Sequence, residues 1–348
     1  MAGSPQTFAE ITTLVLQTLQ DTGASTYDAT ETGFAIENGL REFSKREPHF
    51  VEIRFQIESR TGTDTAGTAS SLTDATRSQF VSGDVGKRVR NTTEKTWAVI
   101  ETFSSTSVVT LNADIMNNGD QYEIYNKNCN NNKQIFIGDI KDYLWIEVVE
   151  YPIGSPRNWE VNYDVLEIFK DTVEDSDPTR DPPNDIEVLV RFAKPHRLLQ
   201  LTDEAGELTA NGTKGDKSIG IDGMGDTEII ERGDEFRIEH HSAIYTITAD
   251  VTTSANAATI NFIPGLEAAS TDNDDITFFI STLLPDQEIL LTDLVVAMVI
   301  KSDLLNFINK TNALAYRDFL LVANDRLVDV QNAIGQTKRR TKRMYPRT

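Results

Sequence analysis

The sequence predicts an α+β fold, in which a discontinuous helical-bundle core with a small sheet carries two inserted all-β modules. Amphipathic helical patterns open and close the 348-residue chain, and a similar β-rich pattern occurs twice between them. Each copy has a Gly-Asp turn, a β-branched strand, an Asn/Asp turn and a closing strand, starting at Gly83 in the first copy and at Gly233 in the second. A scaffold that carries the same kind of module twice favours an assembly protein over an enzyme.

Two helices and a strand are expected before the first module. Apolar residues at helical spacing predict a helix over 9–20, with Thr7 as its N-cap. A second helix, over 29–47, is expected to stop before Pro48, because proline disfavours a helical backbone in the residue before it. The alternation of apolar and polar residues over 50–57 predicts a half-buried strand.

The rest of the core is expected between and after the modules. Strands are predicted over 161–169 and 187–192, on either side of an acidic, proline-containing loop at 171–185. Two long helices are predicted over 286–309 and 313–334, and Gly335 is a natural helix stop.

A module can be inserted into a domain at little entropic cost when its own ends lie close together. The predicted division is core helices and first strand (1–60), first β module (61–127), core strands and loops (128–201), second β module (202–283), C-terminal core helices (284–335) and a basic tail (336–348).

Charge is unevenly distributed along the chain. The formal net charge is −21, yet the residues from 338 to 348 include six basic side chains and no acidic one, so that subtracting these six charges leaves −27 for the rest. An acidic body repels nucleic acid, whereas a short cationic tail favours acidic protein, phosphate or nucleic acid. The basic residues of the tail are Lys338, Arg339, Arg340, Lys342, Arg343 and Arg347.

Cysteine content and hydropathy narrow the class of protein further. Cys129 is the single cysteine, which excludes an intrachain disulfide and disfavours a thiolate metal site. The first eight residues lack the features of a signal peptide. The most apolar window, 289–300, is interrupted by Asp293 and is too short to cross a membrane, so we expect no membrane association.

Residues that commonly carry chemistry form no organised motif. The four histidines include the adjacent pair His240 and His241, which would point to opposite faces of a strand and could not readily bind one metal, and His196 is better placed for a structural hydrogen bond. We find neither a nucleophile elbow nor a glycine-rich phosphate loop with a lysine. The acidic loop at 171–185 could gather a cation such as Ca²⁺, but it matches no fixed ligand spacing, and a solvated loop is the simpler interpretation. The sequence therefore predicts no catalytic residue, cofactor or metal ion.

Several short motifs of the predicted core occur in a characteristic order. They are Asp21-Thr22-Gly23, Leu40-Arg41-Glu42-Phe43, Tyr151-Pro152-Ile153-Gly154, Pro156-Arg157-Asn158-Trp159, Arg191-Phe192-Ala193-Lys194-Pro195-His196 and Ala315-Tyr316 with Phe319. In this order, followed by a basic tail, they resemble the head-to-tail connector (adaptor) proteins of tailed bacteriophages over roughly half of the chain. The resemblance makes Tyr151, Pro152, Trp159, Pro195, His196, Tyr316 and Phe319 candidates for core or interface residues.

This resemblance implies a structural protein of the virion, assembled in the host cytoplasm and placed at the junction of head and tail. Proteins of the family form a ring, typically of twelve subunits, that docks under the portal protein and supports a tail or nozzle protein. The basic tail would reach the portal, and the ring would continue the channel through which double-stranded DNA passes without specific binding. A ring needs heterologous contacts that close, and an acidic wall would keep DNA from binding.

Two other classes of protein remain open. A virion surface or carbohydrate-binding protein could act through its β modules, for which Trp97, Tyr122, Tyr125 and Tyr245 are the aromatic candidates, although strand packing explains these residues equally well. A hydrolase with a pair of carboxylates is the second class, but nothing in this acidic sequence singles out a pair.

Overall fold

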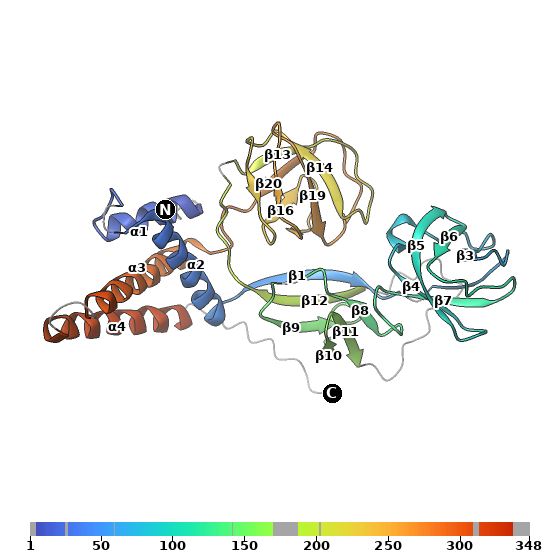
Figure 1. Ribbon diagram of the computed structural model, residues 1–348, viewed down its shortest axis with the longest axis horizontal. Coiled ribbons are helices and arrows are strands. Elements are labelled where there is room, and N and C mark those ends of the chain that lie inside the picture. The colour runs from blue at the N-terminus through green and yellow to red at the C-terminus, as the bar shows by residue number, and fades with distance from the viewer. Residues whose placement is uncertain are drawn as a thin grey trace.

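The computed structural model describes residues 5–24, 27–58, 60–140, 142–169, 187–201, 203–308 and 313–336. Helices occupy one end of an elongated molecule, two small sheets lie in the middle, and two β units extend from the middle (Figure 1). Within the described residues the chain forms twenty strands and four α-helices, so the protein is mostly β.

The four helices pack on one another at one end of the molecule. They are α1 (Phe8–Thr18), α2 (Ala29–Arg46), α3 (Pro285–Ile308) and α4 (Ala313–Gln336). Thr7 caps α1 as predicted, because its side chain accepts a hydrogen bond from the Glu10 N–H while the Glu10 carboxylate accepts one from the Thr7 N–H at 2.8 Å. The core between the helices includes Ile11, Val15, Ile36, Leu40, Phe43, Leu291, Leu294, Val295, Val296, Val299, Val330 and Ile334.

All four helices predicted from the sequence are present, and their ends differ from the prediction by at most two residues. Gly335 lies inside the last turn of α4, so its prediction as a helix stop is wrong: glycine permits the left-handed backbone of a helix end without requiring it. In the part of the chain that the structure describes, none of the helices is long and apolar enough to span a membrane.

Two three-stranded sheets form the middle of the molecule and share one core. The first has the order β1-β12-β9 and the second has the order β10-β11-β8, and all neighbours are antiparallel. The strands are β1 (His49–Gln56), β8 (Gln134–Phe136), β9 (Trp145–Glu150), β10 (Asn158–Asn162), β11 (Val165–Phe169) and β12 (Glu187–Lys194). Apolar residues from both sheets make the core, among them Val51, Ile53, Ile135, Ile146, Val149, Leu166, Ile168, Val188, Val190 and Phe192.

The predicted strand over 161–169 is instead a hairpin made of β10 and β11. The chain reverses at Tyr163, whose backbone adopts a left-handed conformation with φ of 55°. Asn162 and Asp164 on either side favour a turn because their side chains tolerate such a backbone.

The prediction of a discontinuous helical-bundle core with a small sheet is wrong. The helices have a core of their own at one end, and the middle of the molecule has a separate all-β core. The apolar residues of β1, β9, β11 and β12 build two sheets with a common interior, because the sheets bury their apolar faces on each other. In the sequence these short strands are less conspicuous than the helical periodicity.

The first β unit, which we call the open module, is a six-stranded sheet with the order β2-β7-β4-β5-β6-β3. Its strands are β2 (Thr61–Thr63), β3 (Ser71–Thr73), β4 (Arg88–Asn91), β5 (Trp97–Ser105), β6 (Val108–Leu111) and β7 (Gln121–Tyr125), and the short 3-10 helix η1 (Ser82–Asp84) precedes β4. The sheet curls around a core that includes Leu72, Phe80, Val89, Ile100, Val109, Tyr122 and Ile124.

The second β unit is a closed barrel with the order β13-β14-β19-β17-β16-β20, which we call the barrel. Its strands are β13 (Ala205–Leu208), β14 (Ser218–Asp222), β16 (Glu235–Ile238), β17 (Tyr245–Ile247), β19 (Ala258–Ile263) and β20 (Asp275–Phe278); β15 (Ile229–Ile230) and β18 (Val251–Thr252) form a separate ribbon. Four aromatic rings pack against one another in its interior in stacked, edge-to-face or tilted contacts, namely Phe236, Tyr245, Phe262 and Phe278.

The repeat recognised in the sequence is also a repeat of topology. When β2 to β7 are matched in chain order with β13, β14, β16, β17, β19 and β20, the two units have the same order of neighbours. They differ at one place: β13 pairs with β14 and closes the barrel, whereas the corresponding strands β2 and β3 are the two edges of the open module.

The turns of the two units are stabilised in the same way. Asp84 and Asp120 in the open module, and Asp234 and Asp274 in the barrel, each accept a hydrogen bond on a carboxylate oxygen from the backbone N–H three residues earlier, at 2.7 to 2.9 Å. Aspartate favours such turns because its short side chain reaches nearby backbone donors. These are the Gly-Asp and Asn/Asp turns that define the repeat in the sequence.

Each unit enters and leaves the middle of the molecule at one place. The Ile124 N–H donates to the Arg60 carbonyl at 2.8 Å, which joins the two ends of the open module. The Leu199 N–H donates to the Ile280 carbonyl at 2.8 Å and does the same for the barrel.

We predict that Phe236→Ala destabilises the barrel by about 3–5 kcal/mol, because this fully buried ring contacts three other aromatic rings. Phe279→Ala is the matched control, since the neighbouring Phe279 is partly exposed beside Arg237. Calorimetric unfolding of both variants measures the difference. Equal losses of stability would contradict the assignment of Phe236 to the centre of the barrel core.

Candidate functional site: the junctions between the core and the two β units

Arg60 connects the start of the open module to the Gly-Asp turn inside it. The guanidinium donates from Nε to Glu58 Oε1 at 3.0 Å and from Nη1 to Asp84 Oδ2 at 3.1 Å. Lys87 Nζ lies 2.5 Å from Glu58 Oε2 and 2.9 Å from Asp84 Oδ1. Both carboxylates are buried, so the pair of cations offsets the free energy of removing them from water.

Arg197 makes the equivalent connection for the barrel. Its Nε lies 3.3 Å from Asp234 Oδ1, its Nη2 donates to Glu231 Oε2 at 2.6 Å, and its Nη1 donates to the Arg232 carbonyl at 2.7 Å. Gly233 makes room for this guanidinium: its φ is 98°, and a Cβ there would lie 2.7 Å from Arg197 Nη1. We call the Arg60–Asp84 and Arg197–Asp234 pairs the arginine clamps.

The two clamps differ in the ionisation of their aspartates. Burial raises the pKa of Asp84, but the hydrogen bond from Arg60 and the charge of Lys87 outweigh it, so that the pKa lies below its ordinary value. Burial raises the pKa of Asp234 to about 6, and Arg197 offsets this only in part. Asp84 has two cationic partners, whereas Asp234 has one and lies near the like charge of Glu231.

The barrel is also joined to the first central sheet through Glu235. This buried carboxylate lies 2.9 Å from His49 Nε2 at the start of β1 and 3.8 Å from Lys194 Nζ at the end of β12. Burial raises the pKa of Glu235, but the hydrogen bond from His49 and the charge of Lys194 hold it below its ordinary value. Burial lowers the pKa of Lys194. Arg232 and Lys217 extend the contact to the loop before β9, with Asp142 at 3.0 Å and Asp139 at 3.5 Å.

His196 lies at the point where helix, sheet and barrel meet. Its backbone N–H donates to the Ser44 hydroxyl of α2 at 2.8 Å, and its Nδ1 lies 3.2 Å from the Thr282 carbonyl after the barrel. Its ring packs edge-on against Phe43, and its Nε2 is buried without a hydrogen-bond partner among the described residues. Burial, together with the nearby His49, lowers the pKa of His196 to about 4, so the ring is neutral at pH 7.

The other candidate residues from the sequence lie in several places. Tyr151 is buried in the central core and Trp159 packs against that core, whereas Pro152 is exposed and Pro195 is half-buried beside His196. Tyr316 and Phe319 are in α4, but their side chains lie outside the described residues. The acidic loop at 171–185 and the basic residues Lys338, Arg339, Arg340, Lys342, Arg343 and Arg347 also lie outside them.

The aromatic residues that a carbohydrate-binding surface would need are mostly buried. Tyr122 and Tyr245 are within the cores of the open module and the barrel, and Tyr125 is 6 % exposed. Trp97 on β5 is the exception among these four, with 39 % exposed.

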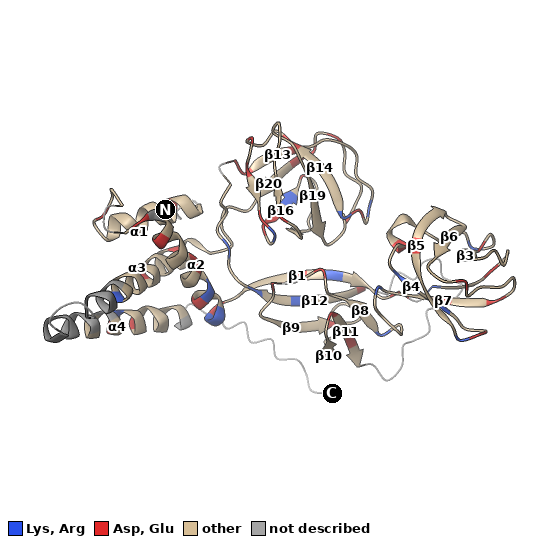
Figure 2. Ribbon diagram, in the orientation of Figure 1, with Lys and Arg blue, Asp and Glu red and all other residues tan. Residues whose placement is uncertain are grey.

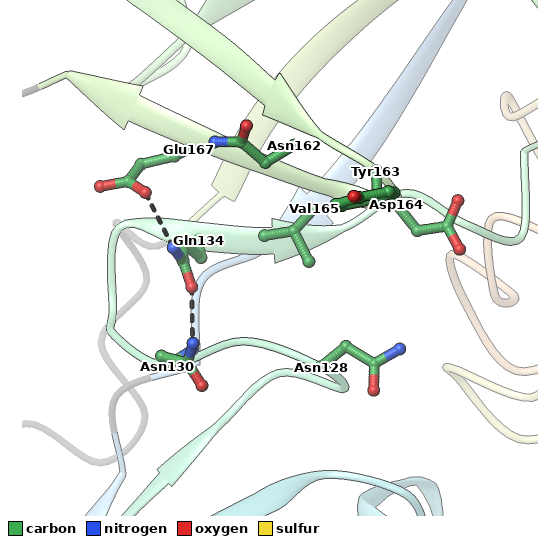
Figure 3. A pocket seen from close by; sticks show the side chains of 8 residues that line it. All are labelled: Asn128, Asn130, Gln134, Asn162, Tyr163, Asp164, Val165 and Glu167. Atoms are coloured by element: carbon green, nitrogen blue, oxygen red, sulfur yellow. Dashed lines mark hydrogen bonds between the residues drawn. The ribbon is translucent and has the colours of Figure 1, made fainter.

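A shallow polar hollow of about 330 Å³ lies beside the β10–β11 hairpin (Figure 3). Gln134 organises one side of it, accepting a hydrogen bond from the Asn130 N–H and donating one to Glu167, both at 2.8 Å. Tyr163 at the tip of the hairpin is fully exposed. These amide and carboxylate groups can hydrogen-bond a polar molecule, and the residues lining the hollow include no nucleophile paired with a base. Elsewhere in the described residues, no group of three potential metal ligands is found.

Sequence reasoning identified His196 and both Gly-Asp turns but missed their partners. Arg60 and Arg197 stand just before their respective modules, yet 24 residues separate the first pair and 37 the second, so no common spacing reveals the clamp. The signal that was available is an arginine shortly before each repeated unit, one residue before the first predicted module and five before the second.

In comparisons with known proteins, no family model, no curated protein and no solved structure matches this chain.

We predict opposite behaviour for the two clamp aspartates. Asp84→Asn should destabilise the protein at neutral pH by about 3–5 kcal/mol, because it breaks a buried ion cluster. Asp234→Asn should change the free energy of unfolding less, and the variant should become more stable relative to the original protein as pH rises. In the folded protein the pKa of Asp234 is about 6, above its ordinary value of 3.8. The neutral carboxyl therefore contributes its full stabilisation below pH 3.8, and this contribution is lost as pH rises through 6. Asparagine has no carboxyl to ionise and avoids this loss.

Calorimetric unfolding below about pH 4 and above about pH 7 tests both variants. A stability difference between Asp234→Asn and the original protein that does not change with pH would contradict the raised pKa. An effect of Asp84→Asn no larger than that of Asp234→Asn would contradict the difference between the clamps.

We predict that His196 contributes to acid sensitivity. Because its pKa falls from 6.5 to about 4 on folding, the stability from the neutral ring is present above pH 6.5 and is lost as pH falls through 4. His196→Asn keeps a donor for Thr282 and should flatten the decline in melting temperature over this range. His240→Asn is the control, since His240 is exposed and should leave the decline unchanged. Identical pH profiles for the two variants would refute the role of His196.

Proposed function

We propose that this chain is a structural virion protein, a ring-forming head-to-tail adaptor. It docks on the portal, extends the DNA channel and provides the platform for tail attachment. The order of the short motifs and the basic tail, which resemble those of head-to-tail connector proteins, support this assignment. The observation in the structure that carries the proposal is a set of large apolar side chains exposed on the helices.

In the part of the chain that the structure describes, three of the four helices carry large apolar side chains that are exposed. Phe34 on α2 is 62 % exposed and Ile289 on α3 is 61 % exposed. On α4, the exposed apolar residues Leu321, Val322 and Val328 accompany the buried Val330 and Ile334. Helices with one apolar face in their own core and further apolar side chains in solvent are suited to pack against neighbouring subunits.

The charged groups also support a structural role. Buried ion pairs join the core to both β units, so these units are held in place as parts of one subunit. The net charge of −27 outside the tail suits the wall of a channel through which DNA must pass without binding. The six basic residues of the tail suit an acidic surface on the portal.

Electron microscopy and mass measurement of the purified protein, alone and mixed with DNA-filled tailless heads, test the proposal. Rings in solution, or rings at the portal vertex, are the expected result. A protein that remains monomeric and does not bind heads would overturn it.

We predict that the double variant Phe34→Asp, Ile289→Asp loses ring formation or head binding while its melting temperature changes little, because both side chains are exposed. The matched control is Ile153→Asp with Phe169→Asp, which changes an exposed apolar residue of the turn between β9 and β10 and another at the end of β11. Unimpaired assembly of the first variant, measured by mass and by head binding, would remove the helices from the subunit contact.

A further inference from the structure

The outer face of the open module carries an exposed tryptophan between two arginines. Arg88 and Arg90 alternate with the buried Val89 on β4, so both point outward, and Trp97 is the registered neighbour of Arg90 on β5. The guanidinium carbons of Arg88 and Arg90 lie 5.7 and 5.6 Å from the centre of the Trp97 ring. Tyr125 on β7 supports the indole from the side, with ring centres 5.6 Å apart.

These residue types are suited to a protein contact. Tryptophan, tyrosine and arginine dominate the binding energy of protein interfaces, because they combine large apolar area with directed polar groups. Trp97 is 39 % exposed, and both arginines are half-buried against it, so little side-chain freedom remains to be lost on binding. We call Arg88, Arg90 and Trp97 the cationic face.

The barrel carries a complementary acidic feature. Glu207 on β13 is in register with Asp222 on β14 and with Asp275 on β20, and all three side chains are exposed. Like charges directly opposite on neighbouring strands destabilise a sheet. A cationic partner would relieve this repulsion. We call these three residues the acidic row.

The overall charges of the two repeated units differ in the same direction as the two surfaces: the barrel is the more acidic unit. Residues 61–127 contain six basic and eight acidic side chains, whereas residues 202–283 contain four basic and sixteen acidic ones. Their net charges are therefore −2 and −12. Acidic positions outnumber basic ones around the barrel in Figure 2. Of the two units, which share one topology, the barrel therefore attracts a cationic partner far more strongly.

We propose that the cationic face of one copy docks on the acidic row of the barrel of a neighbouring copy. This contact rests on the ring proposed above and names one of its interfaces. Each copy has one face of each kind, which a heterologous contact needs if it is to repeat around a ring. The charge complementarity within one sequence favours a second copy over a different protein as the occupant.

Sedimentation velocity of the full chain over a range of concentrations, at low and at high salt, tests the contact. The variant Arg88→Glu, Arg90→Glu should weaken self-association at low salt by at least about tenfold, and high salt should weaken it in the original protein. Adding Glu207→Lys and Asp275→Lys to the same chain should restore association. The control is Arg54→Glu with Lys214→Glu, which makes the same change of charge at exposed positions elsewhere and should associate normally. Melting temperatures verify that every variant is folded.

Each other outcome overturns the contact. If the protein stays monomeric at low salt, the proposed contact is wrong. Head binding then tests separately whether the adaptor function holds. Unchanged association of Arg88→Glu, Arg90→Glu removes the cationic face while the ring proposal stands. Loss of association without restoration by the barrel substitutions removes the acidic row as its partner. A change in melting temperature of the monomer in place of a change in mass would place the contact within one chain.

Discussion

In each β unit one buried turn aspartate pairs with an arginine from the segment that enters the unit, and this ion pair ties both units to the rest of the molecule. In each unit the Gly-Asp turn places a carboxylate in the interior, and an arginine from the segment that enters the unit pairs with it. The pair involves a residue of the linker and a residue of the module, so neither is satisfied unless the module is seated at its base. The orientation of the open module and of the barrel therefore depends on one ionic interaction used twice, reinforced at the barrel by Glu235 between His49 and Lys194.

The adaptor proposal and the charge of the two units fit together through this arrangement. The ion pairs at the base of each unit do not involve Trp97 on β5 or the three carboxylates on β13, β14 and β20, so these outer positions can differ between the two units. The open module uses that freedom for Trp97 and two arginines, and the barrel uses it for carboxylates on three adjacent strands. One topology can thereby present two different surfaces from the same subunit.

Local structure could be predicted from this sequence, but the arrangement of its parts could not. The helices and β1 follow from apolar spacing, and the capping of α1 by Thr7 follows from residue type. The all-β core was missed because β8 and β9 are short, and they become part of a sheet only through pairing with the distant strands β11 and β12. The repeat was visible in its turns, yet closure of the barrel depends on the pairing of β13 with β14, which no local pattern distinguishes from the edges β2 and β3. Among the site residues, His196 was identified for a structural hydrogen bond, whereas the clamp arginines stand at unequal distances from their aspartates.

The joined ends of the two units have a mechanical consequence. Because Ile124 bonds to Arg60 and Leu199 bonds to Ile280, the strands that enter and leave each unit are fastened to each other at its base. Tension applied along the core is carried across this fastening and does not pass through the module. Force along the core therefore bypasses the two modules. A subunit under strain can deform between its helices and central sheets while both β units stay folded.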